Sequence, residues 1–370
     1  MNSNEFGSLE AIGIVITIVI AHLIIYLPER IINELGPASI LNIFYVTAIL
    51  FVFTFIVIKL FKKFDNCDIL DISYYLGGPI LKRILALFFV GYCIFFTGLF
   101  LRDFAESLKI IYFHDFNISV IFLLFLIASL IVNKLGFRKV VRCNFLILPA
   151  ILITIIIVVG ASIPDFTYQR VFPVFGYGFD RTFLFGLGTI SAFSDFIILY
   201  YVIPLLKNKK SFTKVSFVSM FITAFLLVCA VSTLLLVSNY KITQSLLSVY
   251  LATRRISFGI FLRRADSLFV LIWMLSMFSY LSLTTALANY VFKKTKTDSN
   301  TNFPLFIITL LILIVSILPQ NVSQLRFLEN NVLKYLSIIF VFGINFIILI
   351  LGNIKLKLES KRKKLVSQTS

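Results

Sequence analysis

Ten runs of apolar residues, long enough to span a lipid bilayer, fill most of this 370-residue chain. A spanning helix needs about 20 mostly apolar residues. Hydrophobic residues make up 59% of the chain and charged residues 14%, whereas soluble domains carry about 25% charged residues. We place the runs at Ala11–Leu27, Ile40–Leu60, Ile84–Leu101, Ile118–Val132, Phe145–Ile163, Phe183–Leu205, Val215–Val237, Ser267–Phe292, Phe303–Leu318 and Val332–Leu351.

These runs predict an all-α integral membrane protein with ten transmembrane helices. Each run is longer than a typical strand, and a helix satisfies its own backbone polar groups within lipid. The loops are short, so we predict one transmembrane domain over residues 1–354 and a basic tail over 355–370. Ten helices also divide into five plus five. An odd number per half gives an inverted repeat, and in secondary transporters of this kind the ligand site lies at mid-membrane, between discontinuous helices.

The net charge of +17 is explained by where the basic residues lie. If they are assigned to alternate sides of a ten-helix path, 22 of the 34 Lys and Arg fall on the side of the two termini and 12 on the other. Basic residues collect on the cytoplasmic side of a membrane. We therefore predict cytoplasmic termini and no nucleic-acid partner. The tail run Lys361–Lys364 is a candidate contact with anionic lipid.

The residue types that build metal, disulfide and catalytic sites are sparse. The four cysteines occur singly, and His22 and His114 are the only histidines. This spacing supports neither a disulfide framework nor a metal site. The chain also lacks GxSxG, HExxH, Walker-type and dinucleotide-binding motifs. We therefore predict no enzymatic activity, no cofactor and no metal.

A histidine interrupts the first apolar run, which reads AIGIVITIVIAHLIIYLPERI. His22 lies near the middle of this run, and Pro28 lies near its outer end. A titratable residue at that depth is costly unless it faces a cavity or a partner. We interpret His22 as lining a cavity. Proton coupling through His22 is a weaker hypothesis, because a neutral histidine can simply be hydrogen-bonded.

The sixth run, FLFGLGTISAFSDFIILYYVIP, contains a stretch of small and polar residues. These residues are Gly186, Gly188, Thr189, Ser191 and Ser194. Glycine lowers the cost of unwinding, and hydroxyl groups satisfy the backbone groups that unwinding frees. Close helix–helix contact through small residues explains the same pattern equally well.

Asp195, in the same run, is the strongest functional candidate because its burial is so costly. An ionised aspartate within a membrane needs a cation, hydrogen-bond donors or a raised pKa. Arg264 and Asp266, which precede the eighth run, are candidates to face it.

Two further polar groupings stand out. The eighth run has five hydroxyl residues between Ser279 and Thr285, and Tyr280 and Thr284 share one helix face. These residues favour a lined cavity over hydroxyls that only bond their own helix carbonyls. In the segment FLRDFAESL, Arg102 and Glu106 are four residues apart and are expected to pair as an interfacial salt bridge.

Several segments together resemble the B subunit of bacterial spore germinant receptors, the endospore germination permease family. The resemblance covers roughly Asn4 to Leu351, and the order and spacing of its segments make it specific. These segments are IIYLP at 24–28, LRDFAE at 101–106, IPDFTYQRVFPVFGYG at 163–178, SAFSDFIILYYVIPLL at 191–206 and RRADSLFVLIWMLSMF at 263–278.

The resemblance implies a fold and a set of partners. The family is similar to a branch of the amino acid–polyamine–organocation superfamily, which implies an inverted repeat with broken first and sixth helices. It further implies a receptor in the spore inner membrane that senses small nutrients, usually amino acids. Such a receptor works with an A subunit and with a lipoprotein C subunit.

Carried over by position, the resemblance also implies a binding site on three helices. Its residues would be Ala21, His22, Gly188, Thr189, Tyr280 and Thr284. The sequence departs from the family where Ala21 replaces a usual glycine, Ala192 a proline, and Ser194-Asp195 a Gly-Glu pair. The extra alanine methyl leaves less room against the backbone, so these departures affect the identity of the ligand and not the fold.

The leading functional prediction is therefore a nutrient-sensing subunit that triggers spore germination. A nutrient that binds one of two conformations better shifts the population toward that conformation. The alternative is an ion-coupled amino-acid transporter on the same fold, in which Asp195 and His22 bind or relay the cation.

Overall fold

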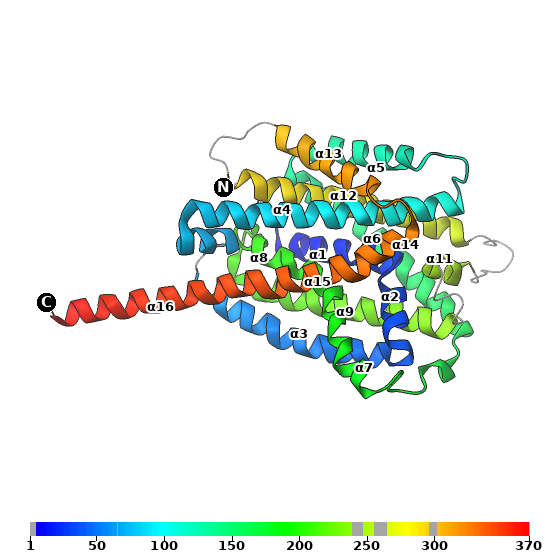
Figure 1. Ribbon diagram of the computed structural model, residues 1–370, viewed down its shortest axis with the longest axis horizontal. Helices are drawn as coiled ribbons and strands as arrows, with labels where there is room; N and C mark the ends of the chain where they lie inside the picture. Colours follow the sequence, from blue (N-terminus) through cyan, green and yellow to red (C-terminus); the bar gives the residue numbers. More distant parts are fainter. Residues whose placement is uncertain (1–4, 65, 239–246, 255–264, 296–301, 370) are drawn as a thin grey trace.

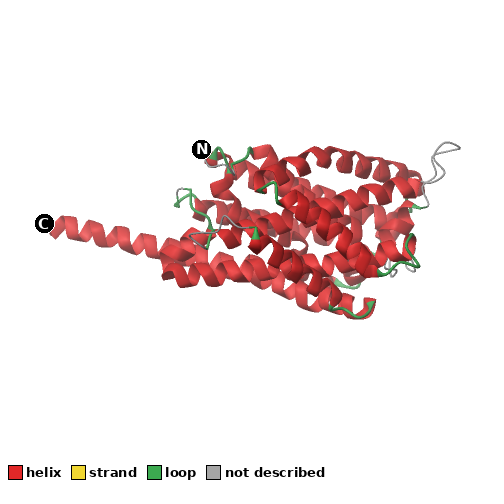
Figure 2. Ribbon diagram, turned by 90° about the horizontal axis from the view of Figure 1, so that it is seen from above, coloured by secondary structure: helices red, strands yellow, loops and turns green. Residues whose placement is uncertain are grey.

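The regular structure in the described part of the chain is helical throughout. The computed structural model describes residues 5–64, 66–238, 247–254, 265–295 and 302–369. Within these ranges, seven helical segments are long and apolar enough to cross a membrane, and three shorter apolar helices accompany them. The long helices run roughly along one axis of the bundle (Figures 1 and 2). The prediction of an all-α, ten-span membrane protein is confirmed.

The α-helices do not all coincide with single spans. The longer ones are α1 (Ser8–Ile25), α2 (Leu27–Leu35), α3 (Ser39–Phe61), α4 (Ile69–Ile111), α5 (Ile118–Asn133), α6 (Phe137–Ser162), α9 (Phe212–Val237), α12 (Ala265–Lys293), α13 (Phe303–Ile317) and α16 (Asn345–Thr369). The shorter ones are α7 (Phe179–Phe183), α8 (Leu199–Val202), α11 (Ser248–Thr253), α14 (Val322–Phe327) and α15 (Lys334–Ser337).

Non-α helical turns join several of these elements. The 3₁₀ segments are η1 (Gly36–Ala38), η2 (Ile163–Asp165), η3 (Tyr168–Val171), η4 (Phe185–Ile198), η5 (Ile203–Leu205) and η6 (Lys209–Ser211). Two π-helical segments, η7 (Leu328–Leu333) and η8 (Ile338–Ile344), interrupt the last long helix. Segments of π-helix are rare in proteins, and those that occur are often found at functional sites.

Helix α1 lies in the interior of the bundle (Figure 1). Every residue from Ala11 to Ile24 is buried, and α1 packs against α6, α9 and α12. A helix that is apolar on all sides has no face for water, so it takes the central place. Any polar side chain between Ala11 and Ile24 is therefore surrounded by protein.

The first span is broken, as predicted, but it is longer than predicted. Helix α1 ends at Ile25, Tyr26 has φ −137° and ψ −20°, and α2 then continues to Leu35, not to Leu27. Pro28 explains the break, because its ring disfavours helical geometry in the preceding residues. The prediction ended the span at Leu27 because charged residues follow, yet Glu29 and Arg30 are buried.

The sixth span is also irregular, which confirms the second predicted break. Segment η4 is a 14-residue stretch of 3₁₀ type, and Phe193 departs from helical geometry at φ −103° and ψ 17°. A 3₁₀-helix of more than about four residues is uncommon. Glycine and hydroxyl residues make this local geometry accessible, as the sequence indicated.

The fifth span was expected from Phe145, but α6 begins at Phe137. Two further predicted spans differ more. The third span was expected over Ile84–Leu101, but α4 runs over 43 residues, Ile69–Ile111, with a kink at Gly77 and Gly78 before Pro79. Gly78 has φ 69°, a conformation that other residues rarely adopt. The tenth span was expected to begin at Val332, whereas the helical path already begins at Val322. In both cases a helix continues through charged residues that seemed to end it.

Both described ends of the chain lie at the same end of the bundle (Figures 1 and 2). Near the N-terminus, Phe6 hydrogen-bonds the backbone of Leu205 and Lys207. Helix α16 extends beyond the bundle, so the residues of the expected tail continue the last helix through Thr369. This arrangement fits the even number of crossings, while the cytoplasmic side stays a prediction from the charge distribution.

Candidate functional site

The two buried titratable residues of the broken spans contact each other. His22 on α1 and Asp195 on η4 are joined by a hydrogen bond of 2.9 Å between Nδ1 and Oδ2. Only 3% of His22 and 7% of Asp195 is exposed. A buried titratable residue needs a partner, and His22 and Asp195 are each other's partner. Arg264 lies outside the described residues, as does the side chain of Asp266, so neither candidate partner is assessed.

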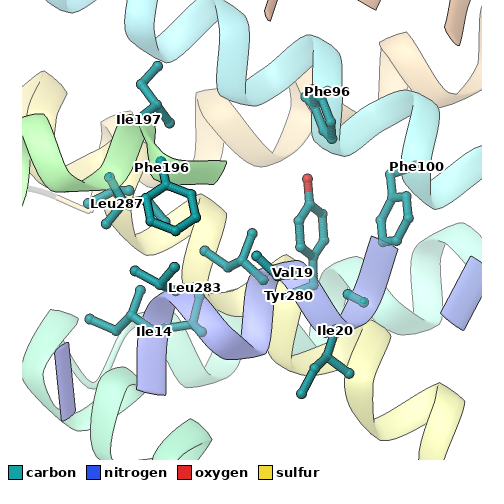
Figure 3. Packing of buried hydrophobic residues seen from close by; sticks show 14 of the residues in the cluster. Ile14, Val19, Ile20, Phe96, Phe100, Phe196, Ile197, Tyr280, Leu283 and Leu287 are labelled. Atoms are coloured by element: carbon teal, nitrogen blue, oxygen red, sulfur yellow. The ribbon is translucent and has the colours of Figure 1, made fainter. Parts of the chain in front are cut away.

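Aromatic rings surround the His22 imidazole. Its ring centroid lies 4.9 Å from Phe96, 4.6 Å from Phe100 and 4.9 Å from Tyr280. Figure 3 shows Phe96 and Phe100 projecting from α4, with the Tyr280 ring of α12 beside them. The second ring nitrogen of His22, Nε2, is buried and has no hydrogen-bond partner within the described residues. One ring nitrogen of His22 is therefore bonded to Asp195, and the other has no partner in the described structure.

Tyr280 and Thr284 lie in this region, but the hydroxyl group of Thr284 is already engaged. Thr284 Oγ1 donates to the Tyr280 carbonyl at 2.9 Å and accepts from Thr97 Oγ1 at 3.2 Å. The alternative interpretation, in which hydroxyls bond their own helix carbonyls, thus applies to Thr284. The hydroxyls of Ser279 and Thr285 have no partner within the described residues.

The remaining predicted site residues have different surroundings. Ala21 on α1 and Thr189 on η4 are each 1% exposed, and Thr189 Oγ1 is a buried hydroxyl without a partner in the described structure. Gly188 instead faces Lys334: an added Cβ would lie 2.7 Å from Lys334 Cε. Similarly, an added Cβ at Gly186 would overlap Asn42 Nδ2. Both interpretations of the small residues in the sixth run, local unwinding and close helix contact, therefore hold, because the segment is irregular and its glycines lie close to neighbouring side chains.

A second buried polar group was missed by the sequence analysis. The guanidinium of Arg326, on α14, lies 2.9 Å from Glu329, 3.5 Å from Asp103 and 3.8 Å from Glu29. Asp103 is fully buried on α4, and Glu329 is 2% exposed. The Arg326 cluster, as we call these four residues, thus connects α2, α4 and the start of the last long helix.

The predicted Arg102–Glu106 pair is present beside this cluster. Arg102 donates to Glu106 at 2.6 Å. However, Arg102 is only 8% exposed, because α4 continues one and a half turns past Glu106 to Ile111. The pair therefore lies within the helix and not at its end. The sequence signal for the larger cluster is the charged segment LRFLEN at 325–330, which lies between the ninth and tenth predicted spans.

An apolar cavity adjoins the break between α1 and α2. Leu23, Ile24 and Pro28 line it, together with apolar side chains of α6, α9 and α12. The hydroxyl of Thr233 faces it without a hydrogen-bond partner in the described structure. Space beside the broken segment allows it to change position, because a fully packed surrounding would resist displacement.

Comparisons with known proteins agree with this architecture. A family model described as spore germination protein matches residues 8–325. No curated protein matches the chain. Among solved structures, the chain resembles a Na⁺-coupled sialic acid symporter in a substrate-bound, outward-open state, with a TM-score of 0.63 and 12% sequence identity. The match covers 92% of this chain and 79% of the symporter. At this identity, the likeness shows a shared transporter fold.

Proposed function

Because the chain belongs to the spore germination protein family and has the fold of a membrane permease, we propose that it is the nutrient-sensing membrane subunit of a spore germinant receptor. In this proposal the complex lies in the spore inner membrane with both termini of this subunit in the cytoplasm. An A subunit and a lipoprotein C subunit assemble with it. The ligand is a small nutrient, an amino acid by preference.

The observation that carries the proposal is that each of the two broken spans carries a buried polar atom without a partner in the described structure. His22 Nε2 and Thr189 Oγ1 are both buried, and neither has a hydrogen-bond partner within the described residues. A buried polar group without a partner costs about 1–3 kcal/mol. A small polar nutrient that supplies the missing partners recovers this free energy, so these two atoms favour a ligand.

Within this site, the predicted residues take different roles. Ala21, His22 and Thr189 meet the polar groups of the nutrient, while Tyr280 and Thr284 contact its side chain. Gly188 acts indirectly, since it sets the approach of Lys334 to η4. Asp195 holds His22 Nδ1 and thereby directs Nε2 toward the ligand.

The proposal is tested with spores from which this chain is deleted and then restored. Germination is measured against amino acids, sugars and salts separately. Loss that is confined to one nutrient class, and recovered on restoration, supports a receptor and identifies its ligand class. Normal germination with every nutrient refutes the role of a germinant-sensing subunit.

The likeness to a Na⁺-coupled symporter favours a second candidate, an ion-coupled amino-acid transporter. In that case His22 and Asp195 bind or relay the coupling cation. Uptake of labelled amino acids into vesicles that contain only this chain separates the candidates. Accumulation that depends on an ion gradient supports transport, whereas saturable binding without accumulation supports sensing.

A further inference from the structure

The Arg326 cluster contains more acidic groups than basic ones. Its carboxyl groups belong to Glu29, Asp103 and Glu329, and each of these residues is at most 7% exposed. Among the described residues, only Arg326 forms ion pairs with them. The charge of Arg30 also acts on Glu329. Two guanidinium groups thus face three buried carboxyl groups, so one carboxyl group has no counter-charge.

The other groups around Asp103 do not remove this excess. Glu106 interacts electrostatically with Asp103 and is itself acidic, while Arg102 is paired with Glu106 at 2.6 Å. The phenol of Tyr26 also interacts with Asp103, and a phenol is neutral at pH 7. A buried charge without a counter-charge is costly, and such a group becomes neutral instead. The cluster therefore needs one more positive charge.

Asp103 is the carboxyl group that most lacks a partner. It is the most deeply buried of the three, at 0% exposed, and neither of its carboxylate oxygens has a hydrogen-bond partner in the described structure. Its ion contact with Arg326 Nη1 is 3.5 Å long, whereas the same nitrogen donates to Glu329 at 2.9 Å. The count of charges and the missing hydrogen bonds therefore point separately to Asp103.

A proton fits this position better than a metal ion does. The described residues contain no group of three or more acidic, histidine or cysteine side chains that could hold a metal ion. A proton needs neither a cavity nor several ligands. It also converts the carboxylate into a neutral group that can donate a hydrogen bond.

We propose that Asp103 binds a proton at neutral pH and that this proton makes the Arg326 cluster electrically neutral. The cluster joins α2 to α4 and to the start of the last long helix. With the proton in place, Arg326 pairs with Glu29 and Glu329. Loss of the proton leaves a negative charge that repels Glu29, with which Asp103 interacts electrostatically. The attachment of α2 therefore depends on the proton of Asp103.

The proposal is tested on the full chain, purified in neutral detergent, by infrared spectroscopy. The readout is the carbonyl stretch of a protonated carboxyl group, which shifts when hydrogen is exchanged for deuterium. We expect the unmodified chain to show this band at neutral pH and Asp103→Asn to lose one carboxyl group's share of it. The control is Glu34→Gln, because Glu34 also lies on α2 but pairs with Lys334 outside the cluster. This control should keep the whole band.

Thermal stability gives a second readout, which does not depend on the spectrum. Asparagine has the shape of a protonated aspartate, so Asp103→Asn should keep its melting temperature at neutral pH. Glu329→Gln removes a charged partner of Arg326 and should lower the melting temperature by about 5 °C or more. For a variant that cannot be purified, abundance in the membrane replaces the melting temperature.

The pH dependence of stability has a definite sign. An aspartate in an unfolded chain is ionised at neutral pH, so the folded chain holds one proton more than the unfolded chain. The melting temperature of the unmodified chain should therefore fall as the pH is raised above neutrality, and it should fall less in Asp103→Asn. A full carbonyl band in Asp103→Asn, or equal loss of stability in Asp103→Asn and Glu329→Gln, would overturn the proposal. Either result would show that Asp103 is ionised.

Discussion

Replacing Asp195 by asparagine should abolish the nutrient response without removing the protein from the membrane. Asparagine has nearly the same shape as aspartate, and its amide oxygen can still accept the hydrogen bond from His22 Nδ1, which is 2.9 Å long in the structure. The change therefore removes the negative charge and leaves the packing intact. Any loss of response reports on that charge.

The expected magnitude follows from the burial of the pair. Removing one partner of a buried ion pair costs about 3–5 kcal/mol, whereas a neutral hydrogen bond within a membrane protein contributes about 0.6 kcal/mol on average. Because 1.4 kcal/mol corresponds to about a tenfold change in an equilibrium constant, an ion pair that holds the responding conformation predicts a rise of 100-fold or more in the half-maximal nutrient concentration. A neutral hydrogen bond predicts that this concentration rises by less than about threefold.

The assay is the half-maximal nutrient concentration for germination of spores that carry Asp195→Asn. An immunoblot of the membrane fraction controls for abundance, and Asp195→Glu controls for charge, since it retains the carboxylate. We also expect His22→Gln combined with Asp195→Asn to be no worse than either single change, because the two residues act as a unit. A normal dose response in Asp195→Asn at normal abundance would refute a role for this charge.

Three further changes test the site and its surroundings. Tyr280→Phe removes a hydroxyl group that contacts the nutrient in the proposed site, so the half-maximal nutrient concentration should rise about two- to tenfold at normal abundance; an unchanged dose response removes Tyr280 from the site. Arg326→Met leaves three buried carboxylates without their cation and should cost about 3–5 kcal/mol, seen as a sharp fall in membrane abundance; normal abundance contradicts this. Gly98→Ala places a Cβ 2.6 Å from Val315 Cγ1 and should lower the melting temperature in detergent, because overpacking costs about 1–3 kcal/mol. Gly91→Ala, with nothing within 4 Å, is its control, and equal melting temperatures would contradict the packing argument.

The sequence was sufficient to predict that the spans exist, because this depends on local properties, whereas both breaks were implied by the family resemblance and only partly supported by the residues. The length of an apolar run determines whether a helix can cross a bilayer. Pro28 and the glycines of the sixth run directly alter backbone preferences at their own positions. His22 and Asp195 were likewise evident, since a titratable residue inside an apolar run is rare.

The contacts between distant segments were not predictable from the sequence. Glu29 and Arg326 are nearly 300 residues apart, and only the fold places them 3.8 Å from each other. The charges in these segments suggested the ends of spans, although buried charges that are paired also occur within a bundle. Gly188 resembled a ligand-site residue for a similar reason, because the sequence could not show that Lys334 occupies the space beside it.

The position of α2 connects the candidate site to the surface of the bundle. Arg30 donates to Ser191 on η4 at 2.8 Å, Glu29 faces Arg326 on α14, and Glu34 pairs with Lys334 on α15 at 2.8 Å. A signal that moves α2 must break these contacts. The partly exposed Lys334 pair is worth about 1 kcal/mol or less, and the buried contacts are worth more, so the total is a few kcal/mol. A nutrient can supply this only if it binds more tightly when α2 is displaced than when α2 has the position seen in the structure. Micromolar to millimolar binding corresponds to about 4–8 kcal/mol. A small nutrient therefore has enough binding free energy to move α2 if most of it depends on that movement.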